Sequence, residues 1–590
     1  MCAAPGHTIR RVRLAVRTHL PATLAVAILA GALGGCGSSS PTGTSASPAT
    51  VVPGSAPLYA EAVVTPTGNL KTYATSTGRT LTGRPKPYAT LLKLLQGPTG
   101  KTPTEQEVKP WLGPHAGVFL SSIDASGSEG LIHEALTKAL SEGLTGVEAA
   151  LLGSGGLPTL LSSSAVQGAL VLDTTDVAKA RSFLEAQAHS ADAHTESYSG
   201  VTYQVAPDGI AEGVVHRFAV IGSEAGVKSV IATAAGGPSL AQASTYTKLS
   251  STAEGSGIQS PALANVYLDL EALTHSIKAA SGGTESTLQL LRGLLGDPGQ
   301  VYLSLIPSTN TVALDVDTLP PTAGSGAGGS SSGGSGTTGA QVLSGLPGGA
   351  WLAIGIGDLD HTVGGNVQGL RALASLASGL NFGSSISVAK VLAPLSSHAI
   401  NVQHDLLSWM GATGIYVSGS SVLNLQAAVL ITSKDPALSR AAVAKIAQAY
   451  REAGGLTSPT SVPGAEVAVT IKLPSFPLTL TMADGQGKFV LGLGPSSVQE
   501  ALNPQTTLAG TPAYTTAANA LGQEIQPSAL IEFRTLLGLI ESLGLNEAPG
   551  FSGIASGLRA LDTLAVGGGK SLPGGVKRAR VVLGLQPAGG

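Results

Sequence analysis

Cysteine and long hydrophobic runs are the scarcest features of this chain. Its 590 residues include only Cys2 and Cys36, so the sequence offers no disulfide framework and no cysteine-rich metal site. The most apolar run covers residues 20–33 and is shorter than the roughly 20 residues that a membrane-spanning helix needs. We therefore expect no transmembrane helix.

Charge is low as well, because only 12% of the residues are Asp, Glu, Lys or Arg. The formal net charge is -3. Arg10, Arg11, Arg13 and Arg17 precede Cys36 with no acidic residue among them, and without these four the chain has 29 basic against 36 acidic residues, a net charge of -7. An acidic chain of this kind excludes nucleic acid as a partner.

The motifs that come nearest to catalytic signatures are incomplete. Thr99-Gly100-Lys101-Thr102 has the tail of a phosphate-binding loop, but Leu95 stands where that pattern requires glycine. His133-Glu134 begins like a zinc-protease helix, but Thr137 occupies the place of the second histidine, which leaves one ligand where a site needs about three. We predict no cofactor and no metal.

The remaining titratable residues form short pairs along the chain: Asp173 with Asp176, Asp269 with Glu271, Asp358 with Asp360, His189 with His194, and His398 with His404. Two carboxylates divide acid and base catalysis only when their environments separate their pKa values. Asp176 is better explained as a helix cap. We therefore predict that the protein is not an enzyme.

Large and basic residues near the predicted strands have a structural interpretation. All three tryptophans, Trp111, Trp351 and Trp409, precede or begin apolar strands, which favours core anchors over the lining of a binding cleft. The late basic cluster Lys577, Arg578 and Arg580 is interpreted as the solvated side of the last strand, with contact to anionic lipid or wall polymer as the alternative.

What is present begins with an export signal. The basic residues 10–17 and the apolar residues 20–33 have the layout of a signal peptide. Leu33-Gly34-Gly35-Cys36 then matches a bacterial lipobox, so we predict cleavage before Cys36 and acylation of its thiol. The expected location is the cell membrane, lipid-anchored on the extracytoplasmic side; the export route and the type of host envelope stay open.

Two low-complexity segments divide the rest. Residues 37–56 are small, polar and interrupted by proline, and we interpret them as a disordered tether. Residues 322–340 are a Gly/Ser linker. The predicted modules are therefore 57–321, with a helical insertion near 127–162, and 341–590.

The two modules share landmarks in the same order, which indicates an internal repeat. Three pairs of matching segments carry the argument: Pro53-x-x-Ala56 with Pro347-x-x-Ala350, Trp111-Leu112-Gly113 with Trp409-Met410-Gly411, and Ser239-Leu240-Ala241-x4-Tyr246-Thr247 with Thr507-Leu508-Ala509-x4-Tyr514-Thr515. Asp176 and Asp435 are then expected to cap equivalent helices. We predict an α+β fold of two tandem modules, each a mainly antiparallel sheet with helices packed on one face.

The segments 52–62, 68–71 and 107–113 resemble the actinobacterial envelope lipoproteins catalogued as domain of unknown function 3352. The resemblance covers most of the chain after Cys36 and implies no known activity, cofactor or catalytic residue. Ser408-Trp409-Met410-Gly411 departs from the Pro-Trp-Leu-Gly form of the first module, which suggests a diverged copy.

The expected function is that of a lipid-anchored, non-catalytic binding or scaffold protein, held in the membrane through Cys36 and presenting a surface to another envelope protein or a wall polymer. The alternative is a carrier or chaperone that shelters a lipid or other apolar ligand in a cleft between sheet and helices. The ligand, the partner, the oligomeric state and the packing of the modules stay open.

Overall fold

The computed structural model describes most of the chain after residue 45, namely residues 46–82, 91, 92, 95, 102–123, 166–254, 261–273, 298–321, 338–357, 402–472, 478–522, 524–542 and 557–586. The predicted signal peptide, the lipobox residues Leu33, Gly34, Gly35 and Cys36, the insertion near 127–162 and residues 322–337 of the predicted linker lie outside the described residues.

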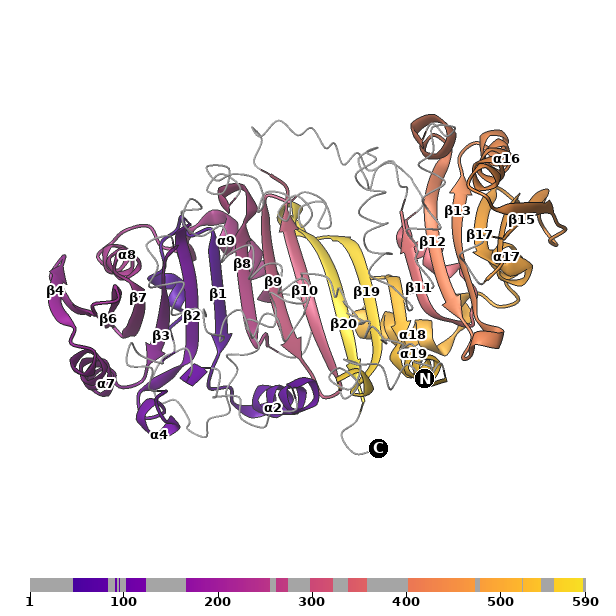
Figure 1. The fold of residues 1–590 in the computed structure, drawn as a ribbon. Helices are drawn as coiled ribbons and strands as arrows, with labels where there is room; N and C mark the ends of the chain where they lie inside the picture. Colours follow the sequence, from indigo (N-terminus) through magenta and orange to yellow (C-terminus); the bar gives the residue numbers. More distant parts are fainter. Residues whose placement is uncertain are drawn as a thin grey trace, which may run out of the picture.

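Twenty strands of the described part of the chain form one continuous antiparallel sheet (Figure 1). The first half of the chain, residues 46–321, contributes ten of them in the spatial order β4-β5-β6-β7-β3-β2-β1-β8-β9-β10. Their bounds are β1 Leu58–Val63, β2 Leu112–Ile123, β3 Val166–Thr174, β4 His194–Tyr198, β5 Val201–Val205, β6 Ile210–Val215, β7 Phe218–Ser223, β8 Ala264–Asp269, β9 Gln300–Pro307 and β10 Thr311–Leu319.

The second half, residues 338–586, contributes the other ten in the corresponding order β14-β15-β16-β17-β13-β12-β11-β18-β19-β20. The two sets join edge to edge where β10 pairs with β20. The bounds are β11 Ala350–Ile356, β12 Met410–Ser418, β13 Gln426–Ser433, β14 Leu456–Pro459, β15 Val467–Lys472, β16 Leu480–Gly485, β17 Lys488–Leu493, β18 Pro527–Glu532, β19 Leu561–Ser571 and β20 Lys577–Leu585.

Helices accompany both halves, so the predicted α+β class is confirmed. In the first half they are η1 Pro48–Thr50, α2 Gly68–Thr82, α4 Glu105–Val108, α7 Val177–Ser190, α8 Glu224–Ala234, η2 Leu240–Gln242 and α9 Ser244–Glu254. In the second half they are α12 Gly339–Ser344, η4 Val402–Leu407, η5 Val422–Asn424, α16 Pro436–Glu452, α17 Gly494–Leu502, η6 Leu508–Gly510, α18 Pro512–Leu521, α19 Phe533–Ser542 and η8 Pro573–Gly575. The helices among the described residues are too short or too polar to cross a bilayer.

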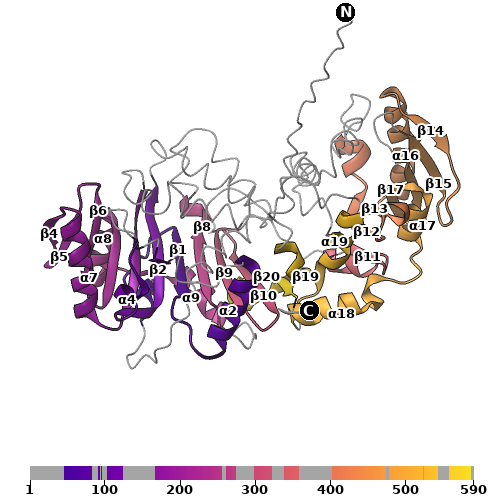
Figure 2. The same ribbon diagram turned by 60° about the horizontal axis from the view of Figure 1, so that its bottom comes forward.

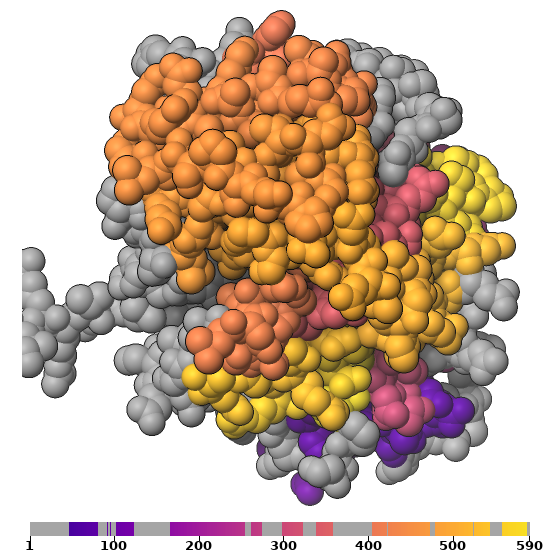
Figure 3. Space-filling view, turned by 90° about the vertical axis from the view of Figure 1, so that its right-hand side faces the viewer, coloured from indigo at the N-terminus to yellow at the C-terminus, as the bar shows by residue number. Residues whose placement is uncertain are grey.

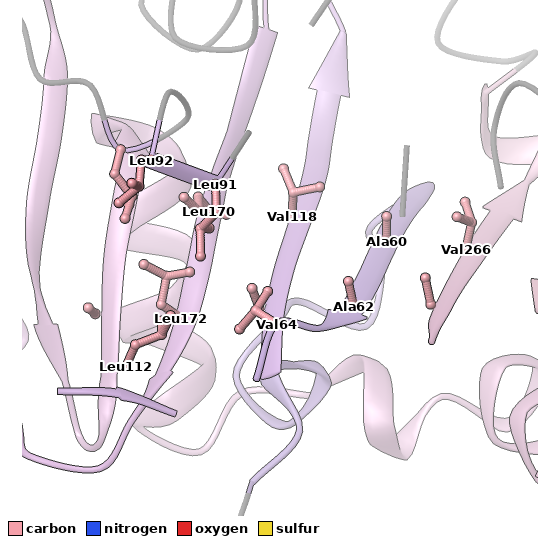
Figure 4. Packing of buried hydrophobic residues seen from close by; sticks show 14 of the residues in the cluster. Ala60, Ala62, Val64, Leu91, Leu92, Leu112, Val118, Leu170, Leu172 and Val266 are labelled. Carbon is pink, nitrogen blue, oxygen red and sulfur yellow. The ribbon is translucent and has the colours of Figure 1, made fainter. Parts of the chain in front are cut away.

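The helices cover both faces of the sheet, which corrects the prediction of a single covered face. Successive residues of β3 point to opposite faces; Leu170 and Leu172 pack with Leu184 of α7, whereas Ala169 and Val171 pack with Val227 of α8. Figure 4 shows part of the first of these two cores, with Leu170 and Leu172 beside Val118 of β2. Because β3 is apolar on both faces, each face must be covered by another element, and here a helix covers each one.

The second half is built in the same way. One core contains residues of α12, α17 and α18, and the other contains residues of α16 together with Trp409. Figure 2 shows α16 and α17 flanking the strands at this end of the molecule, and in Figure 3 the end formed by the β14–β17 hairpins and these helices faces the viewer.

The predicted starts of α7 and α16 are confirmed. The side chain of Asp176 accepts a hydrogen bond from the backbone N–H of Lys179. Asp435 accepts from the N–H groups of Ala437 and Leu438, and Pro436 stands at the first helical position. Both caps satisfy backbone donors that a helix cannot satisfy itself, so local sequence alone determines where these helices begin.

Residues 46–56, placed in the tether by their composition, are folded; we call them the N-terminal strap. Ala49 and Val52 are buried. The strap is held by backbone bonds from Leu240 N–H to the carbonyl oxygen of Val52, 2.8 Å, and from Gly54 N–H to that of Pro238, 2.9 Å. Its small residues therefore reflect close packing on the sheet rather than disorder.

Two buried ion pairs lie where the halves join. Asp315 and Asp317 of β10 stand directly opposite Arg580 and Arg578 of β20. Arg580 donates to both Asp315 oxygens at 2.5 and 2.8 Å, and Arg578 to both Asp317 oxygens at 2.7 and 2.6 Å. The two arginines are only 4% and 3% exposed, so interpreting them as the solvated side of the last strand was wrong; Lys577 alone is exposed.

Each arginine also binds a helix end, and one helix belongs to each half. Arg578 donates to the carbonyl oxygen of Thr252 in α9, 3.0 Å, and Arg580 to that of Leu521 at the end of α18, 2.7 Å. A cation at a helix C-terminus satisfies carbonyl groups that lack an intrahelical partner. The junction thus ties together two strands and two helices.

Replacing Arg580 by alanine should destabilise the junction, because Asp315 is left buried without its main partner. Breaking a buried pair by removing one member costs about 3–5 kcal/mol. The measurements are the free energy of unfolding and hydrogen exchange in β10 and β20. The control Lys577→Ala, on the same strand but exposed, should change neither, and equal effects of the two variants would contradict the ion-pair account.

Candidate functional site

The strap and α12 occupy matching places in the two halves. Leu240 N–H binds the carbonyl oxygen of Val52, and Leu508 N–H binds that of Leu346 in the same way, at 2.7 Å. Isolated bridges also join Pro53 to Ser239 and Pro347 to Thr507. The strap therefore completes the first half as α12 completes the second.

Beneath these segments the two halves differ in chemistry. Glu61 of β1 stands opposite Gly117, and Gly355 of β11 stands opposite Gly414. A Cβ at Gly355 would collide with the carbonyl oxygen of Gly339 at the start of α12, so that position requires glycine. The first half has a carboxylate there instead, and the strap supplies polar partners for it.

Glu61 is the centre of this polar site. Its Oε2 accepts hydrogen bonds from the Ser47 hydroxyl in the strap, 2.8 Å, and from the Tyr59 hydroxyl, 2.6 Å. Its Oε1 lies 2.9 Å from Nδ1 of His115. Tyr59 and Glu61 share a face of β1 because they are two residues apart. Both oxygens of the carboxylate therefore have partners within the chain.

The site changes how its members titrate. Burial, and then the charge of Glu61, raises the pKa of Tyr59. For His115 burial acts to lower the pKa, but the hydrogen bond and charge of Glu61 and the charge of Asp173 outweigh it, so the pKa of His115 is raised. Tyr59 therefore keeps its proton to higher pH than an exposed tyrosine does, and His115 is protonated more readily than an exposed histidine.

Asp173 continues the polar line into β3 and β7. Its side chain is 0% exposed; Oδ1 accepts from Nε of Arg217 at 2.7 Å. Burial raises the pKa of Asp173 despite the opposing charges of Arg217 and His115.

The line of groups from Arg217 to Ser47 crosses four neighbouring positions of the sheet and binds the strap. Each titratable member that we name has a partner in the same line. The arrangement therefore binds the N-terminal segment to the sheet, and we call it the strap site.

The paired residues singled out in the sequence do not converge. Asp173 belongs to the strap site, whereas Asp176 caps α7. Oδ1 of Asp269 accepts from the backbone N–H of Ala272 at 2.9 Å, so it acts as a local cap. Asp358, Asp360 and His398 lie outside the described residues, as do His133, Glu134 and Thr137. Leu95 is described and is buried in the core of the first half.

The described histidines form no cluster either. His194 lies 3.4 Å from Glu196 on the exposed strand β4, and His404 lies 3.1 Å from Asp405. Among the residues that the structure describes, no group of three or more His, Cys, Asp or Glu side chains could hold a metal ion.

The interpretation of the tryptophans as core anchors is confirmed, since all three are buried. Nε1 of Trp111 donates to the carbonyl oxygen of Glu107 at 2.9 Å, and Nε1 of Trp409 donates to that of Asp405 at 2.7 Å. Each ring also packs on a phenylalanine with centroids 5.2 Å apart. These equivalent contacts fix the entry to β2 and to β12.

Glu212 is a buried acid that the sequence analysis did not select. It lies in the middle of β6, 6% exposed, on the same face as Val214, which packs in the core beneath α7. Burial, and then the charge of Asp208, raises the pKa of Glu212 to about 8. The residues on either side of it, Ala211 and Gly213, carry no polar side chain, and this is the sequence signal that indicates its burial.

Replacing Glu61 by glutamine should loosen the strap. Hydrogen bonds to a charged group contribute about 1.5–3 kcal/mol, so hydrogen exchange of the backbone amides in residues 48–54 should rise roughly tenfold or more. In the unchanged protein, protection that depends on protonated His115 is full below pH 6.5 and is lost as the pH rises through its raised pKa.

The matched control for the strap is Glu196→Gln on exposed β4, which should leave exchange in residues 48–54 unchanged. Rates are compared after correction for the intrinsic pH dependence of exchange. Equal protection of the strap in Glu61→Gln and in the unchanged protein at every pH would contradict its docking through this carboxylate.

Replacing Glu212 by glutamine should stabilise the protein at alkaline pH. A raised carboxyl pKa means that the acid's contribution to stability is full below its ordinary value of 4.5 and is lost as the pH rises through about 8. The variant's advantage in free energy of unfolding should grow over that window, on the order of 1 kcal/mol per pH unit, and then level off. Parallel pH profiles of variant and unchanged protein would refute the assignment.

Comparison with known proteins identifies the family of the chain. No functionally curated protein matches the chain. A solved structure described as crystal form I of TP0453 is similar at 11% identity, covering 46% of this chain and 77% of the other with a TM-score of 0.21, a likeness too weak to support an argument. Residues 22–562 match the family described as "Protein of unknown function (DUF3352)". The chain therefore belongs to this family.

Proposed function

We propose that the protein is a lipid-anchored, non-catalytic scaffold of the extracytoplasmic cell surface, attached through Cys36. One structural observation supports this. The strap begins at Ala46, ten residues after Cys36, and it is bonded into the sheet at Ser47, Val52 and Gly54. An anchor at Cys36 would thus be joined to the rigid part of the molecule by a short segment.

The length of that segment limits how far the sheet could stand from the membrane. Ten residues span at most about 35 Å when fully extended, and less in any relaxed conformation. A tether of twenty residues would allow wide movement, whereas this one holds the sheet near the bilayer. The scaffold we propose is therefore a membrane-proximal platform.

The sheet itself is suited to presenting a surface. The two halves share one sheet instead of moving as separate domains, and its outermost strands, β4 and β14, carry protective residues such as Glu196 and Pro459. The partner class that we favour is another envelope protein or a wall polymer, bound along the exposed surface.

The test uses Cys36→Ser in a host that exports the protein. The variant should fold normally and leave the membrane fraction, because the single thiol that could be acylated after cleavage is gone. The released protein should give an unliganded mass by native mass spectrometry. Retention of the variant in the membrane fraction would overturn the anchor, and a stoichiometric lipid adduct would replace the scaffold by an apolar-ligand carrier.

A further inference from the structure

Leu423 is fully exposed to solvent. Its relative exposure is 100%, and it lies in η5, within the loop 419–425 that joins β12 to β13. We call this segment the Leu423 loop. Burying a leucine side chain stabilises it by roughly 1.5–3 kcal/mol relative to leaving it in water. The loop therefore exposes an apolar group that would gain free energy by contact with an apolar partner.

The loop has a defined conformation. Oδ1 of Asn424 accepts from the N–H groups of Ser420 and Ser421, at 3.1 and 2.8 Å, and from the Ser421 hydroxyl at 2.9 Å. Nε1 of Trp351 donates to the carbonyl oxygen of Gly419 at 2.8 Å. Gly419 has a φ of +92°, which a residue with a side chain rarely adopts. Leu423 is therefore held outward by a hydrogen-bonded turn anchored on a buried ring.

The loop lies at the edge of the sheet where the strap enters. The strap starts beside Glu61, two residues before the end of β1 at Val63, and Val63 stands opposite His115 near the start of β2. From β2 to β12 the sheet runs through nine successive antiparallel pairings. An odd number of reversals makes β12 antiparallel to β2, so the end of β12 and the start of β2 share one edge; we call it the strap edge. In Figure 1 the two strands run in opposite directions.

We propose that the Leu423 loop is a second membrane contact, in which Leu423 inserts into the lipid interface. This inference rests on the proposed anchor at Cys36, because the short segment before Ala46 brings the strap edge towards the bilayer. A protein attached to the membrane at one point can rotate about that point. A second contact, added to the acyl anchor, restricts this rotation and orients the sheet.

The chemistry of the loop indicates which lipid surface it fits. Residues 418–428 contain no charged side chain, and the chain after Cys36 is acidic overall. Attraction to anionic headgroups therefore contributes little, and insertion depends on apolar contact with the headgroup and acyl boundary. Contact with zwitterionic phosphatidylcholine should suffice and should be insensitive to salt.

The experiment uses the full lipidated protein carrying Leu423→Trp, reconstituted in phosphatidylcholine vesicles with or without bromine on the acyl chains. The three native tryptophans are buried and supply a constant background. In both kinds of vesicle the emission of the new tryptophan should shift to shorter wavelength. Its intensity should fall only in the brominated vesicles, because bromine quenches a tryptophan that lies among the acyl chains. The fold should be unaffected, since the replaced side chain is fully exposed.

The matched control is Pro207→Trp, in the exposed turn between β5 and β6. Four antiparallel pairings separate β5 from β2, so this turn lies at the opposite edge and its tryptophan should not be quenched. If the protein floats with the vesicles but the tryptophan at position 423 is quenched no more than the tryptophan at position 207, the second contact is overturned and the anchor stays intact. Protein that fails to float would overturn the anchor itself.

Discussion

The register between β10 and β20 depends on two buried ion pairs, and the single sheet depends on that register. A slip of two residues would leave one aspartate and one arginine without their opposite partner, and an unpaired buried charge costs several kcal/mol. A slip of one residue would place the two arginines on the face opposite the two aspartates. The pairs thus select one alignment of two ten-stranded halves over its neighbours, and the helix ends bound by Arg578 and Arg580 follow that alignment.

The strap depends on a similar principle, since it binds a partly shielded carboxylate that has several partners. In the second half α12 packs against glycine and needs no charge. In the first half Glu61 is partly shielded from water, and Ser47, Tyr59 and His115 supply its partners. These bonds make the strap a fixed part of the fold.

Local chemistry made part of this structure predictable. The caps at Asp176 and Asp435 and the buried tryptophans follow from residues close in sequence. The ion pairs could not be predicted, because Asp317 and Arg578 are 261 residues apart and a basic cluster without known neighbours resembles a solvated strand. The folded state of the strap could not be predicted either, because its small residues resemble a flexible tether until the surface on which they pack is known. The site around Glu61 depends on four strands and could be found only with their order.

The way in which the halves are joined also affects where corresponding elements point. Antiparallel pairing of β10 with β20 relates the halves by a rotation of half a turn about an axis through the sheet, so α7 and its counterpart α16 lie at opposite edges, lower left and upper right in Figure 1. The corresponding surfaces of the two halves therefore face away from each other. A partner that lies along one edge of the sheet contacts different elements of the two halves, so each half presents its own set of residues to it.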